Sequence, residues 1–296
     1  MLRSMTAFAA AKGAQDGFSW TWEMRSVNGK GLDLRLRVPD WVDGLEAGLR
    51  ARAGKALGRG NVSLNLRLLR DDGAGALAVN AAQLEDVLTA MSEVENRAMA
   101  RGVTLAPATA ADLLGLRGVL ESGAGEDDTT ALCKTLLADF ETVLAAFLDM
   151  RATEGRALAA VLTAQLDDIE RLTDEAAQAA EARRPEMEQA FKAALARVME
   201  TADTADEARI AQEMALIAVK ADVTEELDRL RAHVAAARDL LAAGSPVGRK
   251  LDFLSQEFNR EANTLCSKAQ NKALTATGLE LKTVIDQMRE QVQNVE

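Results

Sequence analysis

Polar and hydrophobic residues alternate with a period of two in three segments near the start of the chain, at 18–24, 32–38 and 62–68. This period places successive side chains on opposite faces of a strand, so the three runs predict a sheet with one buried face. We expect residues 3–8 to add a fourth strand. The Asn28-Gly29-Lys30-Gly31 segment is typical of a hairpin turn between the second and third strands. Residues 41–57 have helical spacing and are expected to cross the apolar face of the sheet.

After residue 72 the apolar residues follow the helical period. We expect a helix over 80–100, a short turn within 110–120, and a long helical stretch from 129 that breaks at Arg183-Arg184-Pro185. A helical region over 204–241, a helix over 248–268 and a last helix that includes 281–295 follow. The expected fold is α+β, with an N-terminal antiparallel sheet and a crossing helix followed by a long-helix C-terminal region. We divide it into an N-terminal α+β domain with its following helices (1–155), a helical connector (156–205) and a C-terminal helical domain that carries the candidate active site (206–296).

The composition is that of a helix-rich globular protein. Hydrophobic residues make up 48 % of the 296 residues, whereas aromatic residues make up 3 %. No uninterrupted apolar run reaches the roughly 18 residues that a transmembrane helix requires, and the first residues lack the apolar core of an export signal. We therefore expect a cytoplasmic protein. Its two cysteines, Cys133 and Cys266, have neither a disulfide framework nor zinc-site spacing and are expected to be free thiols.

The charge is unevenly distributed along the chain. The net charge of −11 lowers the expectation of nucleic-acid binding, but residues 1–72 carry 12 Lys and Arg against 8 Asp and Glu. An acidic chain can still bind phosphate groups through a local basic patch, or through divalent ions held by its own carboxylates. The basic residues on or beside the predicted strands are expected either to bind phosphates or to neutralise the acidic helices. They are Arg25, Lys30, Arg35, Arg37 and Arg59.

The C-terminal helices carry lines of polar residues opposite their apolar stripes. The line on the 204–241 helix is Asp222, Glu226, Arg229 and His233, and the line on the 248–268 helix is Glu257, Glu261, Thr264 and Lys268, with Asp252, Gln256, Asn259 and Asn263 beside it. The last helix has Glu280, Thr283, Gln287, Glu290 and Asn294. Carboxylates four residues apart repel each other on a bare helix. Together with an acid from a neighbouring helix they could instead hold Mg²⁺ or Mn²⁺, which can polarise a phosphoryl oxygen and lower the pKa of a bound water for phosphodiester hydrolysis.

Spacing leaves both a metal site and a structural role open for these residues. His233, which is the only histidine, could be a ligand, a general base or an ion-paired residue at the surface or an interface. The Asn, Gln and Arg residues of 248–268 could form a buried hydrogen-bond network that fixes the register of the helices. The chain has no Gly-rich phosphate loop, no Cys/His zinc spacing, no Ser-His-Asp set and no dinucleotide-binding fingerprint.

Segments at both ends of the chain resemble the YicC/YloC family. The N-terminal segments are RSMTAF (3–8), EMRSVN (23–28) and RGNV (59–62). The C-terminal segments are DVTEELDRL (222–230) with His233, the stretch 248–268, and MREQVQNVE (288–296). The C-terminal pattern is long and chemically unusual, whereas the middle of the chain, roughly 72–205, matches only as helix. The chain departs from the family pattern at 28–31, where we expect His or Ser followed by Arg and an aromatic residue.

The resemblance implies a divalent-cation-dependent endoribonuclease of the bacterial cytoplasm, which acts in RNA turnover and assembles as a ring-like hexamer. With the polar lines, it suggests Mn²⁺ or Mg²⁺ bound by Asp222, Glu226, Glu257 and Glu261. His233, Glu257, Glu261 and Arg260 are then expected nearest the reacting phosphate. RNA contacts are expected from the basic residues of the sheet and from Arg229, Arg249, Asn259, Asn263 and Lys268. Two alternatives stay open: a non-catalytic RNA-binding or adaptor assembly that presents RNA to other nucleases, and a purely structural protein.

Overall fold

The computed structural model describes residues 1–70, 77–122, 129–201, 212, 215–217 and 219–296. Strands β1 (Ala7–Gln15), β2 (Phe18–Val27), β3 (Leu32–Arg37) and β4 (Gly60–Arg70) form a sheet in the order β1-β2-β4-β3. Long helices follow the sheet, so the expected α+β class is confirmed. No helix in the described part of the chain is long and apolar enough to cross a membrane.

The sheet differs from the expected antiparallel hairpin arrangement at β3. This strand pairs in parallel with β4, and β4 in turn pairs antiparallel with β2, so residues 28–31 do not join neighbouring strands. Parallel neighbours need a crossover, which is provided by helix α1 (Leu45–Ala56), the helix expected over 41–57. The first strand begins at Ala7 rather than at residue 3. Its Ala- and Gly-rich sequence has little alternation in hydrophobicity, which explains why the period alone did not locate it.

One face of the sheet is buried against α1 and the first half of α4 (Thr129–Ala182). Trp22 and Met24 of β2 are fully buried there, together with Phe140 of α4. The carboxylate of Asp139 accepts hydrogen bonds from the indole N–H groups of Trp20, at 2.7 Å, and Trp22, at 2.9 Å. Both buried indole donors are therefore satisfied, which fixes the position of α4 along the sheet.

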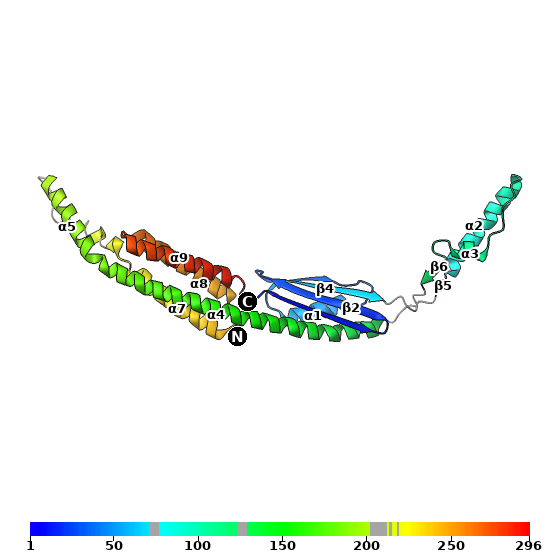
Figure 1. Cartoon of the computed structure of the whole chain (residues 1–296), viewed down its shortest axis with the longest axis horizontal. Coiled ribbons are helices and arrows are strands. Elements are labelled where there is room, and N and C mark those ends of the chain that lie inside the picture. The colour runs from blue at the N-terminus through cyan, green and yellow to red at the C-terminus, as the bar shows by residue number, and fades with distance from the viewer. Residues whose placement is uncertain (71–76, 123–128, 202–211, 213–214, 218) are drawn as a thin grey trace.

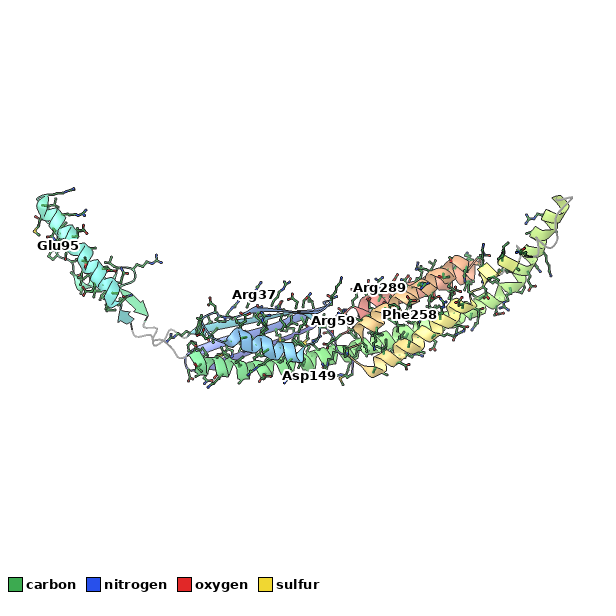
Figure 2. All side chains as sticks on the ribbon, turned by 180° about the vertical axis from the view of Figure 1, so that it is seen from behind. Arg37, Arg59, Glu95, Asp149, Phe258 and Arg289 are labelled. Atoms are coloured by element: carbon green, nitrogen blue, oxygen red, sulfur yellow. The ribbon has the colours of Figure 1, made fainter. Side chains whose placement is uncertain are left out.

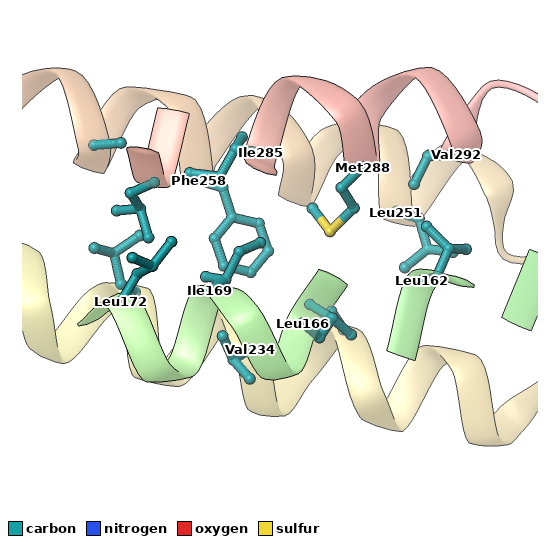
Figure 3. Close-up of a cluster of buried hydrophobic side chains, with 14 of the residues drawn as sticks. Leu162, Leu166, Ile169, Leu172, Val234, Leu251, Phe258, Ile285, Met288 and Val292 are labelled. Carbon is teal, nitrogen blue, oxygen red and sulfur yellow. The ribbon is translucent and has the colours of Figure 1, made fainter. Parts of the chain in front are cut away.

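Helices α7 (Thr224–Ala243), α8 (Gly248–Lys268) and α9 (Lys272–Val292) pack with the second half of α4 into a bundle (Figure 1). Figure 3 shows its core, where Phe258 of α8 lies among Ile169 of α4, Val234 of α7 and Ile285 of α9. The expected break after α4 is confirmed, because α5 (Arg184–Thr201) begins there. The later part of the expected 204–241 helix is α7, which starts at Thr224, whereas residues 204–211, 213–214 and 218 of that prediction lie outside the described residues.

A separate small unit precedes α4 in the chain. It contains strands β5 (Leu77–Val79) and β6 (Leu120–Ser122), which pair antiparallel, and helices α2 (Ala81–Ala100) and α3 (Ala110–Leu114). Neither helix has a buried residue. Figure 1 shows this unit away from the sheet and the bundle, so the exposed apolar side chains of α2, such as Val94, are not covered by either of them.

The sheet unit and the bundle meet at the middle of α4, where both ends of the chain also lie (Figure 1). Arg151 of α4 is 1 % exposed there. Its guanidinium donates to the carbonyl oxygens of Ser4, at 2.6 Å, and Arg59, at 3.1 Å, and lies 3.7 Å from the carboxylate of Glu296. Burial lowers the pKa of Arg151 and the charge of Glu296 opposes that shift. One buried cation therefore connects four segments that are distant in sequence.

Close backbone contacts complete this junction. The Ser4 N–H donates to the Arg151 carbonyl at 2.9 Å, and the Glu296 N–H donates to the Arg3 carbonyl at 3.0 Å. A Cβ atom at Gly155 would lie 2.2 Å from the Leu2 carbonyl oxygen. The N-terminal segment can therefore cross α4 at this distance only because residue 155 is glycine.

Candidate metal centre

The polar lines of α7 and α8 face each other along the contact between the two helices. The helices are antiparallel, so residues early in α7 meet residues late in α8. Glu226 of α7 accepts a hydrogen bond from Lys268 at 2.7 Å, and Arg229 donates to Glu261 at 3.3 Å. One further turn along α7, His233 meets Glu257 and Glu261. Figure 2 shows the side chains of these two helices, with Phe258 labelled.

His233, Glu257 and Glu261 form the tightest group of potential metal ligands in the described part of the chain. One ligand atom from each lies within 4.8 Å of the others. Glu261 is buried, whereas His233 and Glu257 are half-buried. The His233 ring packs edge-on against Phe258, with 5.6 Å between ring centroids and an interplanar angle of 75°. This contact restricts the imidazole orientation and leaves its Nε2 atom buried, with no hydrogen-bond partner in the described residues.

Two arginines lie beside the two carboxylates. Arg229 contacts Glu261 and also pairs with Glu225 one turn earlier on α7. The hydrogen bond that Arg229 donates to Glu261, followed by the charge of Glu225, raises the pKa of Arg229. Arg260 lies 3.8 Å from Glu257 and is largely exposed. The group therefore combines anionic oxygens with cations that can contact a bound phosphate.

Asp222 and Glu226, which the sequence placed in the metal set, lie outside this group. Glu226 is seven residues before His233, which corresponds to about 10 Å along a helix and is too far for a shared ion. Its Oε1 atom accepts from Lys268, and its Oε2 atom is buried with no partner in the described residues. Asp222 accepts from the N–H, at 2.9 Å, and the hydroxyl, at 2.7 Å, of Thr224, and these bonds lower the pKa of its carboxyl.

The other predicted polar residues of α8 lie on its side toward α9. Asn259 donates to Asp286 at 2.8 Å, and Asn263 donates to Asn259 at 2.8 Å. The acids of the α9 line, Glu280 and Glu290, are exposed and are absent from the group of potential ligands found among the described residues. The expected convergence of three helices is therefore a convergence of α7 and α8.

The predicted basic residues near the N-terminus fall into two places. Arg25, Arg35 and Arg37 are exposed on the strands of the sheet. Arg59 is half-buried and donates to the Gly29 carbonyl at 2.7 Å, and Arg249 donates to the Lys30 carbonyl at 3.1 Å. Arg59, Arg249 and Lys30 thus gather around the 28–31 turn, and Figure 2 shows Arg59 at the junction with the bundle.

Sequence reasoning missed two residues that shape the centre. Glu225 forms a second ion pair with Arg229. Its position four residues before that arginine on a helix could have predicted this pair. Phe258 has no polar group that would mark it as part of a site. Its contact with His233 could not be read from the sequence, because it depends on how α7 packs against α8.

The residues at the centre fit a divalent cation. Three ligand atoms within 4.8 Å of one another can reach one ion, and the imidazole of His233, whose Nε2 atom is buried with no hydrogen-bond partner in the described residues, supplies one of them. Three protein ligands leave coordination positions for water and phosphate oxygens. One imidazole among two carboxylates favours Mn²⁺ over Mg²⁺, since Mg²⁺ prefers oxygen ligands alone.

Comparison with known proteins finds matches over most of the chain. A family model described as "Endoribonuclease YicC-like, N-terminal region" matches residues 2–160, and one described as "Endoribonuclease YicC-like, C-terminal" matches residues 175–296. The chain is 38 % identical over 301 residues to the "Probable endoribonuclease YicC" of Haemophilus influenzae, and the alignment covers 100 % of both chains. It is 27 % identical over 303 residues to the "Probable endoribonuclease YicC" of Clostridioides difficile, again over 100 % of both. The chain therefore belongs to the YicC-like endoribonuclease family.

Proposed function

We propose that this protein is a divalent-metal-dependent endoribonuclease that cleaves RNA phosphodiester bonds in the bacterial cytoplasm and acts in RNA turnover. The observation that carries the proposal is the group of His233, Glu257 and Glu261, which lies within the C-terminal match to the endoribonuclease family. Arg229 and Arg260 flank the group and suit the negative charge of a phosphodiester.

The chain's own residues have distinct tasks in this proposal. His233, Glu257 and Glu261 would hold Mn²⁺ or Mg²⁺, which supplies Lewis-acid polarisation of a phosphoryl oxygen and lowers the pKa of a bound water. Arg260, exposed at the rim, binds the phosphate charge. Arg229 holds Glu261 in place. Lys268 is held by Glu226, about two turns before His233 on α7, and would contact the RNA backbone beyond the reacting bond.

Removing the metal is expected to abolish cleavage while leaving RNA binding intact. The test incubates the protein with an end-labelled hairpin RNA after EDTA treatment, then with added Mn²⁺ or Mg²⁺. Cleavage products should vanish with the chelator and return on addition of either ion, more strongly with Mn²⁺. Cleavage that persists in EDTA would overturn the metal role. Binding without cleavage in every cation would favour an adaptor that presents RNA to other nucleases.

We further propose a homo-hexameric assembly, supported by the uncovered apolar side of the α2 unit. Val94 of α2 is exposed and, together with Met91 and Leu105, lines a cavity of about 330 Å³. A second copy of the chain would remove this apolar surface from water. Such an exposed apolar side is typical of helices that pair with another subunit.

Light scattering should give a mass about six times the 31.7 kDa of the chain. Val94→Asp places a charge in the apolar side and should shift the mass to smaller species. Glu93→Gln on the same helix serves as its matched control and should leave the mass unchanged. A stable mass near that of one chain for the unmodified protein would contradict the proposal.

A further inference from the structure

The face of the sheet opposite α1 and α4 is open and carries an ordered set of polar and charged side chains. The strand pairing aligns Phe8 of β1, Arg25 of β2, Ser63 of β4 and Arg35 of β3 in one row across the sheet. The next row is Ala10, Glu23, Asn65 and Arg37, and the third contains Lys12, Thr21 and Arg67. Figure 2 shows Arg37 projecting from the edge of this face.

The first row contains an aromatic ring that lies outside the hydrophobic core. Phe8 is 43 % exposed, although its neighbours on β1, Ala7 and Ala9, are buried on the other face. The guanidinium carbon of Arg25 lies 5.4 Å from the centre of the Phe8 ring. A cation over an aromatic face restrains both side chains and presents a flat surface of mixed ring and guanidinium character. Unpaired nucleobases stack on surfaces of this kind.

The rest of the face carries small or polar side chains between exposed cations. Arg25 and Arg35 lie two strands apart, which is about 10 Å in a sheet, and only the small side chain of Ser63 lies between them. This width suits one extended nucleic-acid strand. The exposed cations of the face are Lys12, Arg25, Arg35, Arg37 and Arg67, against the anions Glu23 and Asp33. The surplus of cations matches the negative charge of a phosphate backbone.

The ion pairs on this face do not oppose such binding. Arg25 lies 4.0 Å from Glu23, and Arg35 lies 3.1 Å from Asp33, in both cases between exposed side chains. Exposed pairs of this kind contribute little stability, so the guanidinium groups can turn to phosphates at small cost. Arg37 is exposed beside them.

We propose that this open sheet face binds a single-stranded segment of RNA, with one base stacked on Phe8 and Arg25 and the following phosphates contacted by Arg35 and Arg37. The proposal rests on the proposed endoribonuclease function for the identity of the ligand. It adds a second RNA site, on a different unit of the chain from the His233 centre. A duplex would present paired bases that cannot stack on the ring, so the site selects unpaired RNA.

A membrane surface fits this face less well. Apart from Phe8, the exposed large apolar side chains of the open face are Val27 and Leu69, near opposite ends of it. Insertion into a bilayer interface needs a continuous apolar face, whereas Thr21, Ser63 and Asn65 make the middle of this one polar.

Binding of a fluorescein-labelled, unstructured 15-nucleotide RNA, followed by fluorescence anisotropy in EDTA, tests the proposal independently of cleavage. Phe8→Ala should weaken binding by about ten- to a hundredfold, as expected for the loss of one stacked base. Phe8→Trp should bind as tightly as the unmodified protein or more tightly. Leu69→Ala removes an exposed apolar side chain from the same face without touching an aromatic ring, and it should change nothing.

Salt dependence separates stacking from phosphate contact. Phe8→Ala should leave the slope of log affinity against log salt unchanged, whereas Arg35→Ala/Arg37→Ala should reduce that slope by about 1.4, the value for two single-strand phosphate contacts. The same sequence as a duplex should be insensitive to Phe8→Ala. Thermal unfolding of each variant shows that the fold is intact, and Phe8→Trp keeps the test valid if the alanine variant fails to fold.

Several results would overturn the proposal. Unchanged binding by Phe8→Ala would show that the ring is a surface residue without a base partner. Unchanged binding by Arg35→Ala/Arg37→Ala at every salt concentration would show that these arginines only neutralise the acidic helices. Binding of the unmodified protein to vesicles of anionic lipid, lost in Phe8→Ala while RNA binding persists, would assign the face to membranes. Because the assay contains no free metal, a failure here is distinct from a failure of the cleavage experiment.

Discussion

Glu257→Gln is expected to lower the rate of RNA cleavage at least about a hundredfold while leaving assembly and RNA binding unchanged. Glutamine keeps the volume and the hydrogen-bonding reach of the side chain but removes the charge that a divalent cation requires. Glu257 is a better position for this test than Glu261, which is almost fully buried and pairs with Arg229. Added Mn²⁺ should restore little activity. Single-turnover cleavage of a labelled RNA measures the effect.

Glu290→Gln provides the matched control, because Glu290 is an exposed acid on α9 outside the His233 centre. It should cleave at the rate of the unmodified protein. If Glu257→Gln also cleaves at that rate, Glu257 does not hold the metal. If it instead fails to assemble, the polar contact between α7 and α8 is structural and the proposal for this centre is incorrect.

Arg151→Met is expected to lower the free energy of unfolding by about 3–5 kcal/mol, as is typical when one partner of a buried ion pair is removed. The substitution leaves the carboxylate of Glu296 and the carbonyls of Ser4 and Arg59 without the cation that they share. Urea unfolding followed by tryptophan fluorescence measures the change, because Trp20 and Trp22 report on the sheet unit beside the junction.

The control is Arg171→Ala, which removes an exposed arginine of α4 that pairs only within its own helix among the described contacts. Its effect should stay within about 0.5 kcal/mol. Adding Glu296→Gln to Arg151→Met should recover part of the lost stability, since the unpaired buried charge is then removed. A loss below about 1 kcal/mol for Arg151→Met would show that the backbone contacts hold the junction without the cation.

The parts of the fold that were predictable from sequence are those with a local signal. Strands β2 and β4 alternate strictly, and the long helices have continuous apolar stripes, so both were located. The pairing of β3 was not, because an Asn-Gly pair is typical of a hairpin and nothing local shows that β4 inserts between β2 and β3. The junction around Arg151 was invisible for a similar reason. Its partners lie 92 to 147 residues away in the chain.

The candidate centre was partly predictable. Residues four apart on a helix share a face, so Glu257 and Glu261 were expected together, and His233 was the only histidine available to join them. Whether Asp222 and Glu226 would join depended on the relative shift of α7 and α8 along their axes. That shift is set by side-chain packing in the bundle core, around residues such as Phe258, and is not encoded in the spacing of either helix alone.

Helix α4 fixes how the sheet unit is rotated relative to the bundle about the helix axis. Its 54 residues run without a break from the sheet through Arg151 into the bundle, so the direction of the open sheet face relative to the His233 centre follows from the number of residues between them. One residue inserted in the middle of α4 would turn one unit about the other by about 100° and move it by about 1.5 Å. Seven residues would nearly restore the angle, with about 20° of error, but would add about 10 Å of separation. The length of this helix between the two cores is therefore constrained independently of the identity of residues such as Arg151 and Gly155.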